Sequence, residues 1–439
     1  MTISQINEAL TQALNEGVDE LARKSGIFKR RCKISGRSLV QGLVQGWIQN
    51  PQASETQLAQ SVGQAGRAVT PQAVNARFTE ATAEFLRAVL EDVTRIIVQP
   101  NQHAQTVLDR FSAVHVSDST VVMLPDEVRH IWPGCGNRTG QGEAGAKIQV
   151  QWDLRTGQLK ELTLHPAREP DRSAPVQTAE VVPQSLRLAD LGYFSLKTFE
   201  RIDAGGGYWM SRYLPGVNLF STTGERLELV EWLQRHCTPG MNAETAVVVG
   251  QECRLPARLV ALRVPAAVAA ERRRKLKEKA RRKGKTASQQ SLTLADWALY
   301  LTNVPATMLS AEEVLIIARA RWQIELLFKL WKSVGGIDES RSKKPFRRLC
   351  EFYAKLIGQI IQHWMIVHIS WQYADRSMTK MAMAIRPCID KLMTGVRTGS
   401  PELMDAALTE MASTVAATCR ISRRSSKSAY FQLLTSPCA

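Results

Sequence analysis

The sequence predicts an α/β protein, in which a mixed β-sheet is flanked by helices and interrupted by a β-rich insertion, with helical regions at both ends of the chain. Three observations support this fold class. A helical pattern runs through the first hundred residues, strand-like alternation begins near residue 111, and a helical pattern returns after residue 310. The length of 439 residues is enough for several domains.

The chain is strongly basic. It contains 57 Lys and Arg residues against 41 Asp and Glu residues, a formal net charge of +16. The 44% hydrophobic and 22% charged content is close to the globular average, which excludes a wholly disordered or fibrous chain. A cationic globular protein attracts polyanions, and nucleic acid is the commonest large one. The basicity therefore predicts a nucleic-acid partner.

Cysteine spacing and hydropathy exclude several other classes. The eight cysteines form no CxxC pair and have no histidine at ligand spacing, which argues against a zinc finger and a disulfide framework and fits a reduced cytosol. The N-terminus lacks the pattern of a signal peptide. The most apolar stretch, residues 356–371, is broken by Gln and His, so we expect a buried helix and no membrane span.

Residues 1–104 are expected to form a helical DNA-binding region. Residues 54–57 have the pattern of a capping box, which starts a first short helix. Thr70 followed by Pro71 is an N-cap with proline at the first helical position, and it starts a second one.

The second of these helices is expected to run through Val74 and Phe78, with Arg77 on its polar side. Two short helices with polar and basic groups on the second suit a helix-turn-helix that presents Arg77 to DNA. An ordinary helical hairpin is the alternative, because the pattern is common in helical regions.

Residues 105–214 are expected to form the first part of the sheet domain. Strand-like runs at 113–116 and 120–124 predict two strands, with Asp118 at the end of the first. The strand that ends at Asp190 is a second place where an acidic residue follows a strand.

Other elements of this part follow from the same patterns. Residues 147–152 and 159–164 predict a hairpin around an Arg-Thr-Gly turn. Ser195 is expected to cap a helix, and residues 208–213 predict a strand that carries Arg212.

Residues 215–290 are expected to form a β-rich insertion with a basic arm. Val- and Leu-rich runs at 245–250 and 258–264 predict strands, and residues 271–285 hold ten basic and two acidic residues. A solvated, partly helical arm explains such a run. A charge of +8 within it would also hold several phosphates through counterion release.

Residues 291–371 are expected to complete the sheet domain, and residues 372–439 to form a helical C-terminal region. A strand over 297–303 precedes a capping box at Ser310. One long helix is expected to continue from there through Lys332.

Arg321, Glu325 and Lys332 are spaced by four and seven residues, so all three are expected on one face of that helix. A surface ion-pair ladder is the usual explanation of such spacing. The helix is apolar almost all round, so we expect it to be largely buried, and buried charges need partners or a function.

Asp118, Asp190 and Glu325 come from three separate elements of one predicted sheet domain. Three such carboxylates can hold two divalent cations about 4 Å apart, the arrangement used in phosphoryl transfer. Hard oxygen ligands without a Cys/His cluster favour two Mg2+ or Mn2+ ions over zinc.

The pattern Arg321-x3-Glu325-x6-Lys332, preceded by the segments 118–120 and 190–194, resembles the DDE transposases of bacterial insertion sequences. More narrowly, it is similar to the subgroup, insertion-sequence family four, that carries a YREK signature and a β-rich insertion between the second aspartate and the glutamate. The resemblance covers roughly residues 105–370. The sequence departs from the signature at Ala318, where the family has tyrosine, and this removes one expected contact to the DNA backbone.

This resemblance implies an RNase H-like core in which Asp118, Asp190 and Glu325 are the catalytic, metal-binding residues. Arg321 and Lys332 would bind DNA phosphates near the cleaved end, and Arg212 would do the same. Trp297 stands where such transposases often place an aromatic that stacks on a flipped base. A core tryptophan at the start of a strand is the alternative.

The resemblance also implies the function. It predicts a cut-and-paste transposase that cleaves and joins double-stranded DNA at terminal inverted repeats, acts as a homodimer on paired ends, and is cytoplasmic and nucleoid-associated in a prokaryote. A DNA-binding regulator built on an inactive transposase scaffold, or a nuclease without strand transfer, would carry many of the same features.

Overall fold

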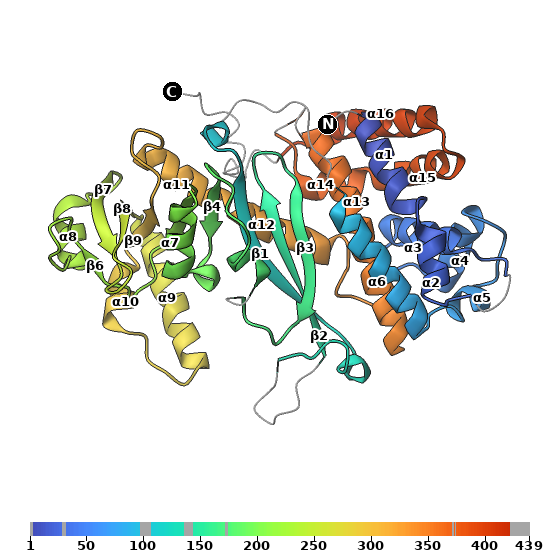
Figure 1. The fold of residues 1–439 in the computed structure, drawn as a ribbon, viewed down its shortest axis with the longest axis horizontal. Helices are drawn as coiled ribbons and strands as arrows, with labels where there is room; N and C mark the ends of the chain where they lie inside the picture. Colours follow the sequence, from blue (N-terminus) through green and yellow to red (C-terminus); the bar gives the residue numbers. More distant parts are fainter. Residues whose placement is uncertain are drawn as a thin grey trace. The chain divides into compact units, whose positions relative to one another are not determined.

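The structure is a computed structural model that describes residues 3–28, 32–96, 107–135, 144–171, 174–370, 373 and 375–421 (Figure 1). The fold is mixed α/β, as the sequence predicts. The described residues contain nine strands in one mostly antiparallel sheet, in the order β3-β2-β1-β4-β5-β9-β8-β7-β6.

The chain divides into two compact units. Unit 1 comprises the described residues within Met1–Ala104, Asp118–Pro170 and Gln323–Phe431, and unit 2 comprises those within Gln105–Ser117 and Asp171–Trp322. Each unit is assembled from segments that are far apart in the sequence. The division into five segments that the sequence analysis expects, 1–104, 105–214, 215–290, 291–371 and 372–439, stays a prediction.

Unit 1 is mostly helical. Its helices are α1 (Ile3–Leu14), α2 (Val18–Lys24), α3 (Gly36–Gln49), α4 (Glu55–Gln64), α5 (Pro71–Asn75), α6 (Glu80–Arg95), α12 (Trp322–Ser333), α13 (Pro345–Ser370), α14 (Met378–Ala384), α15 (Ile389–Thr398) and α16 (Pro401–Thr418). The last three occupy the predicted helical C-terminal region, of which residues 422–439 lie outside the described residues.

Helix α13 is the centre of unit 1. Almost all of its side chains are buried, and it packs against α3, α6 and α14. Gly358 permits the close approach of α3, because a Cβ there would lie 2.8 Å from Ile48 Cγ1. The prediction of a buried helix over this apolar stretch is confirmed. Among the residues described, no helix is long and apolar enough to cross a membrane.

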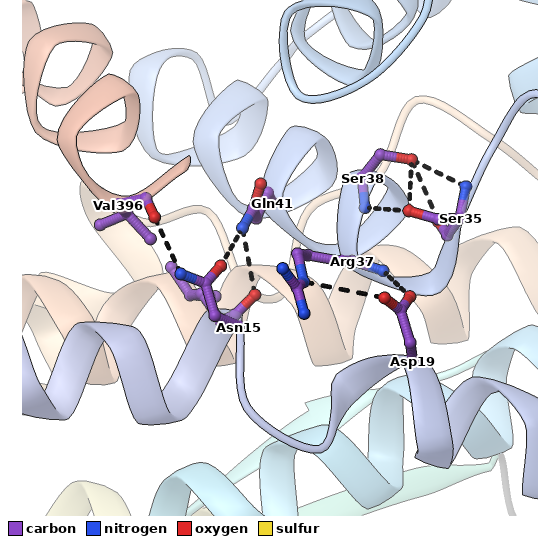
Figure 2. A network of polar contacts seen from close by, with 8 residues as sticks. Asn15, Asp19, Ser35, Arg37, Ser38, Gln41 and Val396 are labelled. Carbon is purple, nitrogen blue, oxygen red and sulfur yellow. Dashed lines mark hydrogen bonds and ion pairs between the residues drawn. The ribbon is translucent and has the colours of Figure 1, made fainter. Parts of the chain in front are cut away.

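Polar contacts join the N-terminal helices to one another and to the C-terminal ones (Figure 2). The Gln41 side chain donates to Leu14 O at 3.2 Å and to Asn15 Oδ1, and Asn15 Nδ2 donates to Val396 O at 2.8 Å. The N-terminal helices are therefore built into unit 1, so deletion of residues 1–100 would expose its core.

Both expected N-terminal helices are present with the expected caps. Ser54 forms a capping box at the start of α4, and Thr70 accepts from Ala73 N at the start of α5. The expected continuation to Phe78 is wrong, because α5 ends at Asn75. Phe78 instead leaves the helix and contacts Trp47, with ring centroids 6.2 Å apart.

The first three strands in chain order are β1 (Val114–Met123), β2 (Gly145–Asp153) and β3 (Leu159–Pro166). β2 and β3 form the predicted antiparallel hairpin. The expectation of two strands around Asp118 is wrong, because β1 runs without interruption through it. No glycine or proline stands there to break the extended backbone.

Unit 2 holds the other strands, which are β4 (Leu186–Ala189), β5 (Tyr208–Arg212), β6 (Leu219–Phe220), β7 (Asn242–Val249), β8 (Leu255–Arg263) and β9 (Trp297–Thr302). Its helices are α7 (Leu196–Ala204), α8 (Leu229–His236), α9 (Ala266–Arg282), α10 (Gln289–Leu294) and α11 (Ala311–Ala320). β4 pairs in parallel with β5. The remaining pairs are antiparallel: β5 with β9, β9 with β8, β8 with β7, and β7 with β6.

The β-rich insertion extends the sheet of unit 2. The strands expected at 245–250 and 258–264 are β7 and β8, and β8 pairs with β9 over six positions, from Arg258 to Arg263. The core beneath contains Phe199 from α7 stacked on Trp209 from β5, with ring centroids 4.4 Å apart. Aromatic burial therefore fixes α7 on the sheet.

His363 couples α13 to the β2–β3 turn in unit 1. Its Nε2 donates to Gly157 O at 2.9 Å, its Nδ1 has no hydrogen-bond partner in the described structure, and the ring is buried beside Trp152. Burial lowers the pKa of His363 to about 4, while the bond to Gly157 opposes this shift. The folded protein therefore holds this imidazole neutral.

We predict that His363 makes the folded protein lose stability in mild acid. The unfolded chain takes up the proton near pH 6.5 and the folded chain only near pH 4, so the stabilisation is complete above 6.5 and is lost as pH falls toward 4. The free energy of unfolding should fall by up to about 3 kcal/mol in that window. Urea unfolding at several pH values would measure it, and His363→Gln should flatten this part of the profile.

Candidate active site

Asp118 lies within β1, and its side chain is half-buried. Its Oδ1 accepts a hydrogen bond from Ser119 N at 2.8 Å. Ser117, the residue before it, is buried. The strand therefore holds the backbone at Asp118 in place, and the carboxylate keeps access to solvent.

Asp190 directly follows β4, as predicted, and it is also half-buried. In unit 2, residues 114–116 of β1 pair in parallel with residues 186–188 of β4. Asp118 and Asp190 each come two residues after the last paired residue of their strand. The two aspartates therefore occupy equivalent positions along strands that run in the same direction.

Glu325 lies in the first turn of α12 and is half-buried. Ile324, Leu327 and Trp331 bury the opposite side of the helix. The carboxylate thus belongs to a helix fixed by its apolar face.

The expected single long helix is wrong. α11 begins at the predicted Ser310 capping box but ends at Ala320, and α12 begins at Trp322. Arg321 lies between them with helical dihedral angles (φ −51°, ψ −33°), and no glycine or proline marks the interruption in the sequence. Trp322 is 55% exposed, so the expected burial fails at this position.

Arg321 and Asp190 form an ion pair in unit 2. An Nη atom of Arg321 lies 3.7 Å from Asp190 Oδ1, and the two side chains are 16% and 36% exposed. The predicted phosphate-binding arginine is therefore paired with one of the predicted metal ligands.

Lys332 attaches α12 to β1 in unit 1. Its Nζ donates to Val121 O at 2.9 Å. An ammonium group has three protons to donate, so this bond leaves two of them for another acceptor. Lys332 therefore aligns the helix of Glu325 with the strand of Asp118.

The other predicted DNA-binding residues are carried by elements other than α12. Arg77 lies after α5 in unit 1, and Arg212 is exposed at the end of β5 in unit 2. Trp297, at the start of β9, is only 5% exposed and belongs to the hydrophobic core of unit 2. This burial is what the core alternative predicts, and the stacking role of Trp297 stays a prediction.

Arg272 is a cation that the sequence did not distinguish from its basic neighbours. Its side chain donates to Trp297 O at 3.0 Å. Burial lowers the pKa of Arg272, and the positive charge of Arg212 adds to this shift. The proximity of Arg212 and Arg272 creates a local concentration of positive charge in unit 2, which only the fold brings together.

The donor chemistry of the three carboxylates fits a hard divalent cation. Within the described residues, no group of three or more His, Cys, Asp or Glu side chains lies together as a metal site. Asp118 and Glu325 belong to unit 1 and Asp190 to unit 2. Ala318, the departure from the signature, is half-buried on α11.

Residues 111–359 match the family described as the transposase DDE domain. This match covers more than half of the chain and includes all three carboxylates, Arg321 and Lys332. The chain belongs to this family of DDE transposases.

Individual relatives are transposases of insertion sequences. The chain is 30% identical over 364 residues to the transposase for insertion sequence element IS231F of Bacillus thuringiensis subsp. israelensis, which covers 78% of this chain and 76% of the relative. It is 24% identical over 321 residues to the transposase for IS1151 of Clostridium perfringens, with 67% and 66% covered. The putative transposase InsL for IS186A of Escherichia coli (strain K12) is 31% identical over 231 residues, with 51% and 61% covered.

We predict that Lys332→Met destabilises unit 1. The substitution removes the donor to Val121 O and leaves a carbonyl without its charged partner, which costs about 1–3 kcal/mol. Urea unfolding would measure the difference. Lys329→Met is the matched control, because Lys329 is an exposed lysine on the same helix. Equal stability of the two variants would contradict the bridging role of Lys332.

Proposed function

We propose that the protein is a transposase that cuts an insertion sequence from double-stranded DNA at its terminal inverted repeats and joins it to a target. One observation carries this proposal: the match to the transposase DDE domain spans residues 111–359, and the three candidate carboxylates Asp118, Asp190 and Glu325 lie within that range. The equivalent strand positions of the two aspartates support their acting together. The assignment to insertion-sequence family four and the RNase H-like core belong to this proposal.

Asp118, Asp190 and Glu325 would hold two divalent cations, Mg2+ or Mn2+. Such ions, when bound, supply Lewis-acid stabilisation of the phosphorus centre and activation of the attacking oxygen. The chain itself contributes the three oxygen donors and their orientation by β1, the end of β4 and α12. Asp118 Oδ1 is already oriented by Ser119 N.

Arg321 and Lys332 would bind phosphates of the DNA end. Arg321 offers a planar fork that suits a phosphate bidentately, and Lys332 offers two protons not used by Val121 O. Binding of a cation by Asp190 would compete with its ion pair to Arg321.

The remaining basic surfaces would bind phosphates along the rest of the DNA. These are the N-terminal region around Arg77, Arg212 with Arg272, and the basic helix α9. Pairing of two element ends by a homodimer, and action in the cytoplasm at the nucleoid, complete the proposal. The basic net charge of the chain supports a DNA partner.

Removal of a metal-binding carboxylate should abolish cleavage. We expect Asp118→Asn, Asp190→Asn and Glu325→Gln each to lower metal-dependent nicking of a labelled element end by more than about 100-fold, because the cation loses a charged ligand. The assay compares Mg2+, Mn2+ and EDTA with the wild type and each variant.

Glu312→Gln is the matched control, because Glu312 is an exposed carboxylate on α11 outside the proposed ligand set. A pre-cut end with a free 3′-hydroxyl and a plasmid target tests joining in the same series. Nicking without joining would indicate a nuclease, and binding without nicking would indicate a regulator on an inactive scaffold. Wild-type cleavage by Glu325→Gln would refute the proposed site.

Helix α9 makes a separate prediction, because its cations are not equivalent. Arg273 pairs with Asp296, and Arg274 lies within ion-pair distance of both Glu271 and Glu278. Among the exposed cations of α9, those with no ion pair in the described structure are Lys277, Lys279 and Arg281. These three are the ones free to contact phosphates.

We expect the triple variant of Lys277, Lys279 and Arg281 to glutamine to bind DNA more weakly and with a salt dependence reduced by about 3 in slope. Arg274→Gln should change the slope little, because its charge is already balanced within the helix. Fluorescence anisotropy of a labelled duplex across a salt series measures both. Equal effects of the two variants would argue against a role for the unpaired charges.

A further inference from the structure

Unit 1 contains a cavity of about 460 Å³ between the start of α3 and the turn that joins α4 to α5. Its lining residues are Lys33, Ile34, Ala68, Val69, Thr70, Ala73 and Arg77. We refer to it as the Lys33–Arg77 pocket. Figure 2 shows the neighbouring start of α3, where Ser35 and Ser38 form the capping box that fixes this end of the helix.

The Lys33–Arg77 pocket is positively charged. Its lining includes two cations and no carboxylate. Within the part of the chain that the structure describes, neither Lys33 nor Arg77 forms an ion pair, whereas nearby Asp19 is engaged by Arg37. The sequence adds three further cations at 29–31, immediately before this region. The pocket is therefore suited to an anion.

Arg77 is held in place before any ligand arrives. Its guanidinium lies over the Phe28 ring, 5.2 Å from the centroid, and its Nη1 donates to Ile27 O at 3.5 Å. Its Nε is buried and has no hydrogen-bond partner in the described structure. The contacts with Phe28 and Ile27 both restrict the guanidinium, so less side-chain freedom is lost when it binds an anion.

The size and lining of the pocket select the kind of anion. Its volume exceeds that of a bare phosphate, and Ile34, Val69 and two alanines give part of the wall an apolar character. Such a wall accommodates a sugar beside the charged group. The Thr70 hydroxyl already accepts from Ala73 N at 3.2 Å, so its own proton remains available for a phosphate oxygen.

The position of Arg77 favours contact with the DNA backbone over base reading. Arg77 lies beyond the end of α5, which has only five residues, whereas a helix-turn-helix reads bases with residues of the recognition helix itself. Phosphate contacts fix the register of a protein on DNA without reading the sequence.

We propose that the Lys33–Arg77 pocket binds one backbone phosphate, with its sugar, of the DNA that the protein acts on. This inference rests on the proposed function, because it takes DNA as the partner. Lys33 and Arg77 neutralise the same phosphate, and Thr70 donates to it. The pocket thereby positions unit 1 on the DNA end.

The test is a salt series of DNA binding by the full-length protein, measured by fluorescence anisotropy of a duplex that carries the element end. Lys33→Gln and Arg77→Gln should each weaken binding about five- to tenfold. Their double variant should reduce the salt slope by about 1 in total, because one phosphate is lost. Arg77→Lys should retain the slope, since it keeps the charge.

Lys24→Gln and Arg95→Gln are the matched controls. Both residues are exposed cations of unit 1 that already pair with carboxylates, Lys24 with Glu20 and Arg95 with Asp92. Pocket variants that bind like these controls would overturn the proposal, and so would a double variant that loses about 2 in slope, because two phosphates would then be involved. Lys33 is exposed, so its variant remains informative if Arg77→Gln does not fold.

Two further measurements separate this proposal from its alternatives. Metal-dependent nicking is measured on the same duplex. If the wild type nicks and the pocket variants bind DNA as tightly as the wild type, the pocket proposal alone is refuted. A wild type that neither binds nor nicks would refute both proposals. Saturable binding of inorganic phosphate that Arg77→Gln abolishes, with an unchanged DNA salt slope, would assign the pocket to free phosphate and overturn the DNA assignment.

Discussion

The burial of helix α13 is the constraint on which the rest of unit 1 depends. This helix of 26 residues carries the groups that hold each neighbouring element. Lys355 donates to Gly336 O and to Glu339 O, both at 2.8 Å, and so fixes the loop that follows α12. Gln362 Nε2 donates to Ala382 O in α14, and Arg347 pairs with Glu55 at the start of α4. One buried helix thus connects the segment after the Glu325 helix to the N-terminal and C-terminal helices.

The buried ion pair of α13, Lys355 with Glu351, is tolerated because its charged groups are satisfied. Lys355 is 1% exposed, and it pairs with Glu351 at 2.8 Å in addition to its two carbonyl partners. Glu351 in turn accepts from Ser340 Oγ at 2.7 Å. Full pairing offsets the desolvation of the two charges, and loss of one partner would leave the other uncompensated. The pair therefore makes the position of the loop specific.

The charged residues of the candidate active site are also occupied within the protein. Arg321 neutralises Asp190, and Lys332 holds Val121 O. These contacts satisfy charged groups that are partly buried. A cation bound at Asp190 would therefore compete with the contact to Arg321, and the net gain on binding is the difference between the two.

The sequence alone determined the family and most local elements and proposed the three candidate carboxylates, because these depend on short patterns. The capping boxes at Ser54 and Ser310, the β2–β3 hairpin and the aspartate after β4 were all predicted in place, since caps, turns and alternation act over a few residues. Only the tertiary structure decided the break at Arg321, the unbroken strand through Asp118, the early end of α5 and the burial of Trp297. It also created the Lys33–Arg77 pocket, whose two cations are 44 positions apart in the chain. Packing and pairing between distant segments settle such features, and local patterns in the chain do not encode them.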